Sequence, residues 1–249
     1  MQVTLGTFHA TQAIRQAVNA VLDSGRLSYG PVTRHYEQRF ADMHGCICGV
    51  ASNSGTSSLV VALQALKELH NWSDGDEVII PSLTFAATVN AILHNRLTPV
   101  LVDIEPITYN INAWRIEDAI TRRTRCILPV HLFGQPANMK TIKRIARHYD
   151  LRIVEDSCEA MLATFEDRPV GSWGDIACFS TYSAHLLVTG VGGMATTNNA
   201  DYAKVMRSLV NHGIDLAELP NGEQYDPSWL ARKFRFTRIG HSFRVTEIE

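Results

Sequence analysis

Ser180, Thr181 and His185 follow an apolar run at residues 176–179 and precede a glycine-rich turn that ends at Gly193. Hydroxyl groups at the end of a buried strand are well placed to hold a ligand, because ligands of α/β sheets lie beyond the carboxyl ends of strands. The imidazole of His185 titrates near neutral pH, so it can accept or donate a proton in the same pocket. A solvated loop histidine between two strands explains this stretch alone equally well.

A second candidate site is the turn Gly55-Thr56-Ser57, which joins an apolar run at residues 49–51 to a helical pattern. The free N–H groups and the dipole of a helix N-terminus attract anions, and hydroxyl side chains add donors. The glycine spacing is that of neither a P-loop nor a dinucleotide-binding fingerprint. The turn therefore predicts either an anion site or an ordinary N-cap.

Acidic and aromatic residues follow two further predicted strands. Asp156 ends the apolar run at residues 151–156, and Glu159 lies three positions beyond it. Phe85 lies where a strand at residues 77–81 gives way to a helix, and propensity favours a core position for it, although an aromatic ring there can also cover a flat ligand.

These residues need a scaffold, and the hydrophobic periodicity indicates one. Apolar residues at helical spacing predict helices at residues 11–24, 112–121, 139–148 and 203–210, with others around Tyr36 and Leu63 and through Val89, Ile92 and Leu93. Short apolar runs predict strands at residues 49–51, 77–81, 99–103, 126–130, 151–156, 176–179 and 194–197. The alternation predicts an α/β fold with a mostly parallel sheet flanked by helices.

Composition narrows the class of protein. The 249 residues are 45% hydrophobic with a net charge of -2, which gives no support for nucleic acid or a membrane surface as a partner. A basic and aromatic run at residues 232–244 is too short to change that expectation. No signal peptide or membrane-spanning segment is evident, so we expect a cytoplasmic protein, and the cysteine spacing predicts no metal site.

The order of these motifs resembles the DegT/DnrJ/EryC1/StrS family of pyridoxal-phosphate-dependent sugar aminotransferases, which has the fold type I architecture. The resemblance also covers residues 27–31 and 240–247. It implies an N-terminal helical segment at residues 1–30, a cofactor-binding large domain at residues 31–210, and the start of a C-terminal region at residues 211–249. Family members continue into a small C-terminal domain, so we expect this chain to be a truncated copy.

The resemblance also implies roles for individual residues toward pyridoxal 5'-phosphate or pyridoxamine 5'-phosphate. Thr56 and Ser57 in the Gly55 turn would hold the phosphate, and Ser180 would add a hydroxyl. The side chains expected around the pyridine ring are Phe85 stacked on it, Asp156 paired with its protonated nitrogen, and Glu159 near its hydroxyl.

His185 stands where aminotransferases of the family have the lysine that forms a Schiff base with the cofactor, and imidazole cannot form that bond. This replacement resembles the 3-dehydratase branch, in which pyridoxamine phosphate acts on a nucleotide-linked 4-keto-6-deoxyhexose of deoxysugar and lipopolysaccharide biosynthesis. His185 would move the proton while the C3 hydroxyl leaves. Glutamate as amino donor and a homodimer are further implications.

Three other positions help to decide which form of 3-dehydratase the chain resembles. No cysteine follows Cys178, which disfavours the iron–sulfur form of the dehydratase. Val191 stands where the cluster-free form of the dehydratase usually has Glu. Ser242 stands where the family commonly has Asn. These two differences leave the identity of the sugar substrate undetermined.

Three other interpretations stay open at this stage. A sugar aminotransferase would need a nucleophilic lysine, and the nearby candidates, Lys204 and Lys233, lie in the wrong places. A truncated, non-catalytic family fragment would keep the fold alone. A flavodoxin-like or other nucleotide-binding domain fits the periodicity but leaves the order of Asp156, Ser180 and His185 unexplained.

Overall fold

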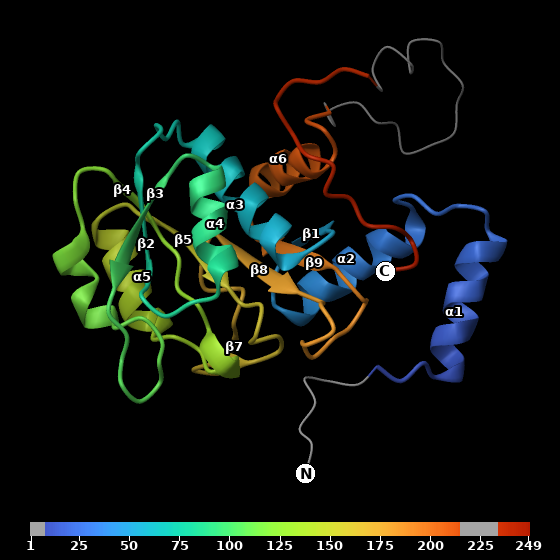
Figure 1. The fold of residues 1–249 in the computed structure, drawn as a ribbon, viewed down its shortest axis with the longest axis horizontal. Helices are drawn as coiled ribbons and strands as arrows, with labels where there is room; N and C mark the ends of the chain where they lie inside the picture. Colours follow the sequence, from blue (N-terminus) through green and yellow to red (C-terminus); the bar gives the residue numbers. More distant parts are fainter. Residues whose placement is uncertain (1–7, 215–233) are drawn as a thin grey trace.

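Seven strands form one sheet within residues 8–214 and 234–249, the part of the chain that this computed structural model describes (Figure 1). The strands are β1 (Cys48–Ser52), β2 (Glu77–Pro81), β3 (Thr98–Val102), β4 (Thr124–Ile127), β5 (Arg152–Asp156), β8 (Ile176–Ser180) and β9 (Gly193–Thr197). Their order across the sheet is β1-β9-β8-β5-β4-β2-β3. The five strands from β8 to β3 run parallel, and β9 is antiparallel to its neighbours β8 and β1. The predicted mostly parallel α/β sheet is confirmed.

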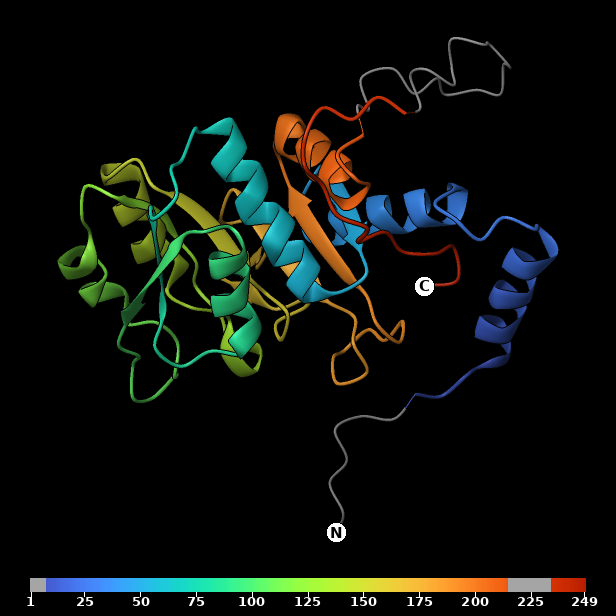
Figure 2. The same ribbon diagram turned by 45° about the horizontal axis from the view of Figure 1, so that its top comes forward.

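Helices cover both faces of this sheet (Figure 2). They are α2 (Pro31–Met43), α3 (Gly55–Leu69), α4 (Ala86–His94), α5 (Met139–His148) and α6 (Ala200–Val210). Helix α1 (Gln12–Asp23) lies apart from the sheet (Figures 1 and 2). Helices α3, α4 and α6 share one core cluster with alternate strand residues such as Val78 and Ile80. The intervening residue Ile79 belongs to the cluster of α5 on the opposite face. Burial on both faces is what parallel strands require, and it explains their continuous apolar runs.

None of the helices in the described part of the chain combines the length and the apolar character that crossing a bilayer requires.

The expected helix at residues 112–121 is wrong. The segment forms two short 3-10 turns, Ala113–Arg115 and Glu117–Ala119, and Ile120 is already extended. The Asn112 side chain accepts a hydrogen bond from the backbone N–H of Trp114. Ala113 and Ile116 are fully buried, so packing and this local cap replace a continuous helix.

A small hairpin was not expected from the sequence. Strands β6 (Thr164–Phe165) and β7 (Arg168–Pro169) pair antiparallel around Glu166 and Asp167, which both have positive φ angles of 46° and 59°. Two-residue hairpin turns of this kind usually carry Asn-Gly or Asp-Gly. With no glycine in the turn, the sequence contains no signal for it.

The described C-terminal residues contact the start of α2 through one buried carboxylate. Glu247 accepts hydrogen bonds from the backbone N–H groups of Gly30 (2.6 Å), Val32 (2.9 Å) and Thr33 (3.0 Å), and from the Thr33 hydroxyl. The N-cap residue Gly30 has no side chain to perform this task, so Glu247 satisfies the free N–H groups of the first turn. In residues 246–249 the N–H of Thr246 donates to the carboxylate of Glu249 at 2.8 Å, and the N–H of Ile248 donates to the Thr246 hydroxyl at 3.3 Å. These are the side-chain contacts of a helix N-terminus.

We expect Glu247→Ala to lower the free energy of unfolding by about 2 kcal/mol at pH 7, because three N–H groups lose their acceptor. Although burial opposes ionisation, the hydrogen bonds from Thr33 and the neighbouring N–H groups lower the pKa of Glu247. A lowered pKa in the folded state gives stability above the unfolded value of about 4.3, which is lost as the pH falls through the folded value. Urea unfolding of Glu247→Ala and of the exposed control Glu249→Ala measures this, and equal stability of the two at pH 7 would contradict it.

Candidate functional site

The N-terminus of α3 lies against the carboxyl end of β8, and two glycines allow this close approach. A Cβ atom added at Gly55 would lie 2.8 Å from Cβ of Ser180 and 2.9 Å from Sγ of Cys158. A Cβ atom added at Gly193 would overlap the carbonyl group of Ser54. The Gly55 turn and Ser180 are therefore in direct contact, and any side chain at Gly55 would collide with Ser180 and Cys158.

The first turn of α3 is a set of hydrogen-bond donors. The Ser54 hydroxyl accepts from the N–H of Ser57 at 3.1 Å, and the Ser57 hydroxyl donates to Oδ1 of Asn53 at 2.7 Å. Ser57 is buried, whereas Thr56 is exposed at the start of the helix. The remaining first-turn N–H groups have no acceptor within the helix, so this turn can hold an anion.

Asp156 ends β5 on the same face of the sheet as α3 and α4, and its carboxylate is held in place. Oδ2 accepts a hydrogen bond from the Thr88 hydroxyl at 2.8 Å, and the Thr84 hydroxyl lies 2.8 Å from that of Thr88. Oδ1 accepts from the N–H of Cys158 at 3.3 Å. The side chain is 5% exposed. Sequence reasoning missed Thr88, which lies in the first turn of α4, four positions after Thr84.

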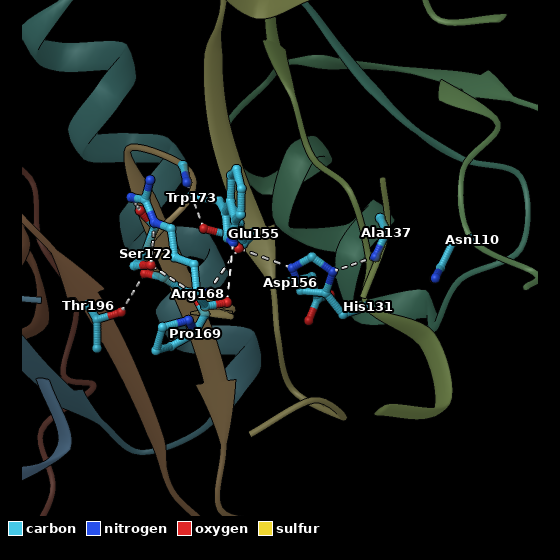
Figure 3. Close-up of polar contacts among 12 residues, drawn as sticks. Asn110, His131, Ala137, Glu155, Asp156, Arg168, Pro169, Ser172, Trp173 and Thr196 are labelled. Carbon is cyan, nitrogen blue, oxygen red and sulfur yellow. Dashed lines mark hydrogen bonds and ion pairs between the residues drawn. The ribbon is translucent and has the colours of Figure 1, made fainter. Parts of the chain in front are cut away.

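A second carboxylate, Glu155, points to the opposite face of the sheet and is fully buried (Figure 3). It accepts hydrogen bonds from the N–H groups of Gly171 (2.9 Å) and Gly174 (2.6 Å), and from Nε2 of His131 (3.1 Å). The N–H of Ala137 donates to Nδ1 of His131 at 3.0 Å, so the imidazole proton is on Nε2. Burial opposes ionisation of Glu155, but the His131 hydrogen bond and the glycine N–H groups lower its pKa.

This network also holds the backbone of the neighbouring Asp156. The N–H of His131 donates to the carbonyl of Asp156 at 3.0 Å, and the N–H of Asp156 donates to the carbonyl of Pro129 at 2.9 Å. The side chain and the backbone of His131 thus bind two successive residues of β5. Nothing in the sequence pattern pairs His131 with Glu155.

Phe85 and Glu159 lie at the rim of this region. Phe85 is the N-cap residue of α4 and is 76% exposed, so the core position favoured by propensity is wrong. Glu159 accepts a hydrogen bond from the N–H of Phe133 at 2.6 Å, which ties it to the loop after β4. The contacts expected of both residues with a pyridine ring stay predictions.

His185 lies in a turn between β8 and β9, where its N–H donates to the carbonyl of Tyr182 at 2.9 Å. The residue is half-buried. Burial lowers the pKa of His185, and the charges of Glu159 and Asp156 act on it in the opposite direction. Burial therefore favours the neutral form of this imidazole, which lies within electrostatic range of both predicted acids.

Residues 9–249 match the sequence profile of the DegT/DnrJ/EryC1/StrS aminotransferase family. The chain belongs to this family. It is 40% identical over 222 residues to GDP-perosamine synthase of Caulobacter vibrioides, covering 89% of this chain and 55% of that protein. It is 32% identical over 239 residues to dTDP-4-dehydro-2,6-dideoxy-D-glucose 3-dehydratase of Saccharopolyspora spinosa, covering 90% and 52%.

A solved structure supports the same assignment. The Escherichia coli GDP-4-keto-6-deoxy-D-mannose-3-dehydratase with bound hydrated pyridoxal phosphate superposes with a TM-score of 0.91 at 28% identity, covering 100% of this chain and 65% of that one. The fold is that of fold type I pyridoxal-phosphate enzymes. The chain spans between half and two thirds of the length of these relatives.

Members of this family are pyridoxal-phosphate-dependent sugar aminotransferases or dehydratases, and structural neighbours carry pyridoxal phosphate or pyridoxamine phosphate. The donor set described above fits such a cofactor. The α3 N-terminus with the hydroxyls of Ser57 and Ser180 suits its phosphate, and the buried carboxylate of Asp156 suits a protonated ring nitrogen.

Proposed function

We propose that this chain acts in nucleotide-sugar biosynthesis as a 3-dehydratase that removes the C3 hydroxyl of a nucleotide-linked 4-keto-6-deoxyhexose. The feature that carries the proposal is His185, a half-buried imidazole whose neutral form is favoured by burial and which lies within electrostatic range of Asp156 and Glu159. The family resemblance implies that it stands where related aminotransferases have their lysine. Similarity to two 3-dehydratases supports it.

Each residue has a physical task in this proposal. Thr56, Ser57 and Ser180 bind the phosphate, and Asp156 stabilises positive charge on the ring nitrogen, with its carboxylate oriented by Thr88. When bound, the cofactor supplies an electron sink. An imidazole nitrogen of His185 accepts a proton and returns it, and it forms no covalent bond to the cofactor. A lysine there would bind the cofactor covalently and favour transamination.

The partners and the location belong to the same proposal. Glutamate would supply the amino group that regenerates pyridoxamine phosphate, and a second copy of the chain would complete a homodimer. We place the protein in the cytoplasm, since its five cysteines are all free thiols, as a reducing compartment favours. The division into a segment at 1–30, a large domain at 31–210 and a C-terminal region from 211 is proposed on the same basis.

The deciding experiment is an absorbance titration with pyridoxal phosphate and pyridoxamine phosphate, before and after borohydride. We expect the wild type to bind both forms with no fixed adduct, and His185→Lys to acquire one. His185→Asn should bind the cofactor but lose dehydration of GDP-4-keto-6-deoxymannose in the presence of glutamate. The exposed control His148→Asn should keep that activity.

The pH profile adds an independent measurement. Because burial lowers the pKa of His185, its base form persists below the ordinary value of about 6.5, so the acidic limb of turnover should lie below that pH. A borohydride-fixed adduct on a wild-type lysine would overturn the dehydratase and favour the aminotransferase. Lys204 is exposed on α6, and Lys233 lies outside the described residues. Failure to bind either cofactor form would favour the non-catalytic fragment.

A further inference from the structure

A basic groove lies along α5, outside the candidate site. Its lining residues are Lys140, Lys143, Arg144, Arg147, Arg168 and Trp173, and its volume is about 490 Å³. The four cations of α5 are spaced at i, i+3, i+4 and i+7, which places them on one side of the helix. Arg168 and Trp173 come from β7 and the segment that follows it. Five of the six lining side chains are therefore cationic in a chain whose net charge is -2.

Most of this positive charge has no local counter-charge. Lys140 pairs with Glu166 at 3.2 Å and Arg144 with Glu117 at 3.7 Å. In residues 8–214 and 234–249, no carboxylate comes within 4.0 Å of Lys143, Arg147 or Arg168.

The crowding of cations affects Lys143 directly. Burial, followed by the charges of Arg168 and Arg147, lowers its pKa. The carboxylates that act on it from further away are occupied elsewhere, Glu155 by His131 and Asp175 by the N–H of Ile153. An anion in the groove would relieve this repulsion.

One wall of the groove is already ordered. The guanidinium of Arg168 stacks on Trp173 at 4.8 Å from the ring centroid, and its Nε donates to the Ser172 hydroxyl at 2.9 Å. The Phe165 ring packs edge-on against Trp173, with the two ring centroids 5.4 Å apart. Figure 3 shows Arg168, Ser172 and Trp173 gathered on one side of Glu155. A guanidinium fixed in this way loses little conformational entropy when it binds an anion.

The groove is separate from the candidate site. Helix α5 packs on the face of the sheet that contains Ile127 and Ile153, whereas Asp156 contacts Thr88 of α4 on the opposite face. A ligand in the groove and a cofactor at the α3 N-terminus would therefore lie on opposite sides of the sheet.

We propose that the basic groove binds a diphosphate group, either free pyrophosphate or the diphosphate of a nucleotide. The three unpaired cations match its charge, and arginine side chains bind phosphate oxygens in pairs. The volume suits a small ligand. A nucleic acid or an anionic membrane would need an extended basic surface, which the chain's net charge of -2 argues against.

Calorimetric titration of the full chain with inorganic pyrophosphate, GDP and GMP tests the proposal. We expect one pyrophosphate site, weakened roughly tenfold or more in Lys143→Gln/Arg147→Gln and by high salt, because charge-assisted contacts are lost. The control Arg122→Gln/Lys204→Gln removes two exposed cations elsewhere and should bind as the wild type does. Circular dichroism checks that both double variants remain folded.

Further titrations distinguish a nucleotide from free pyrophosphate as the ligand, and the basic groove from the α3 N-terminus as the binding site. Tighter binding of GDP than of pyrophosphate identifies a nucleotide, and equal binding identifies the free diphosphate. Pyrophosphate binding should persist in protein saturated with pyridoxal phosphate and in Ser57→Ala. If either change abolishes it while Lys143→Gln/Arg147→Gln has no effect, the ligand occupies the α3 N-terminus and the proposal is overturned. Preferential binding of RNA or anionic vesicles through the groove would also overturn it.

Discussion

We expect Glu155→Ala to lower the free energy of unfolding by about 3–5 kcal/mol, because each buried donor left without an acceptor costs about 1–3 kcal/mol. The change leaves the Nε2–H of His131 and the N–H groups of Gly171 and Gly174 buried without an acceptor. Urea unfolding at pH 7 measures the loss. The exposed Glu166→Ala is the control, and we expect it to change the stability by less than about 0.5 kcal/mol.

The isosteric change Glu155→Gln sharpens this prediction. All three partners of the carboxylate are donors, so the amide NH₂ group of a glutamine would face an N–H group. We therefore expect a clear but smaller loss of stability than in Glu155→Ala. In the wild type the pKa of Glu155 is lowered, so its contribution is present above about pH 4.3 and disappears as the pH falls through the folded value. Wild-type stability in both variants would show that the network contributes nothing.

The second large effect should come from Asp156→Asn. A neutral amide cannot hold positive charge on a ring nitrogen, so we expect cofactor-dependent turnover to fall by roughly 10²- to 10³-fold, as for the loss of other electrostatic contacts at a reacting centre. The variant should remain folded, because the amide oxygen can still accept from the Thr88 hydroxyl.

Thr88→Val distinguishes the effect of the negative charge of Asp156 from the effect of the orientation of its carboxylate. It removes the hydroxyl that orients the carboxylate but keeps the negative charge, so its effect on turnover should be smaller than that of Asp156→Asn. Turnover assays, with absorbance titrations of cofactor binding, measure both variants. Equal turnover of Asp156→Asn and the wild type would rule out the proposed role of this carboxylate.

Periodicity predicted the parts of the molecule that depend on local pattern. Buried parallel strands appear in the sequence as continuous apolar runs, so the sheet could be predicted from the sequence. Because Asp156 and Ser180 end two of these strands, their position at the same edge of the sheet could be predicted as well. The roles of these residues toward a cofactor came from a resemblance, because residue types and spacing alone were compatible with an N-cap or a loop histidine.

Contacts between segments that are distant in the sequence could not be predicted from local periodicity. His131 and Glu155 are 24 positions apart on different elements, and only the folded sheet brings them together. The turn at Glu166 and Asp167 adopts positive φ angles without glycine, and Phe85 is exposed despite its apolar ring. For the pair His131 and Glu155, tertiary contacts and not local pattern decide the structure.

The contact of Glu247 with α2 has a consequence for biosynthesis on the ribosome. Thr33 and Glu247 are 214 positions apart, so the first turn of α2 has no acceptor from Glu247 until almost all of the described chain has been made. Closing so long a loop costs more chain entropy than any local contact does. During synthesis from the N-terminus the sheet can assemble first. The N–H groups at the start of α2 stay without this acceptor, and that segment stays accessible to chaperones and proteases, until Glu247 has been synthesised.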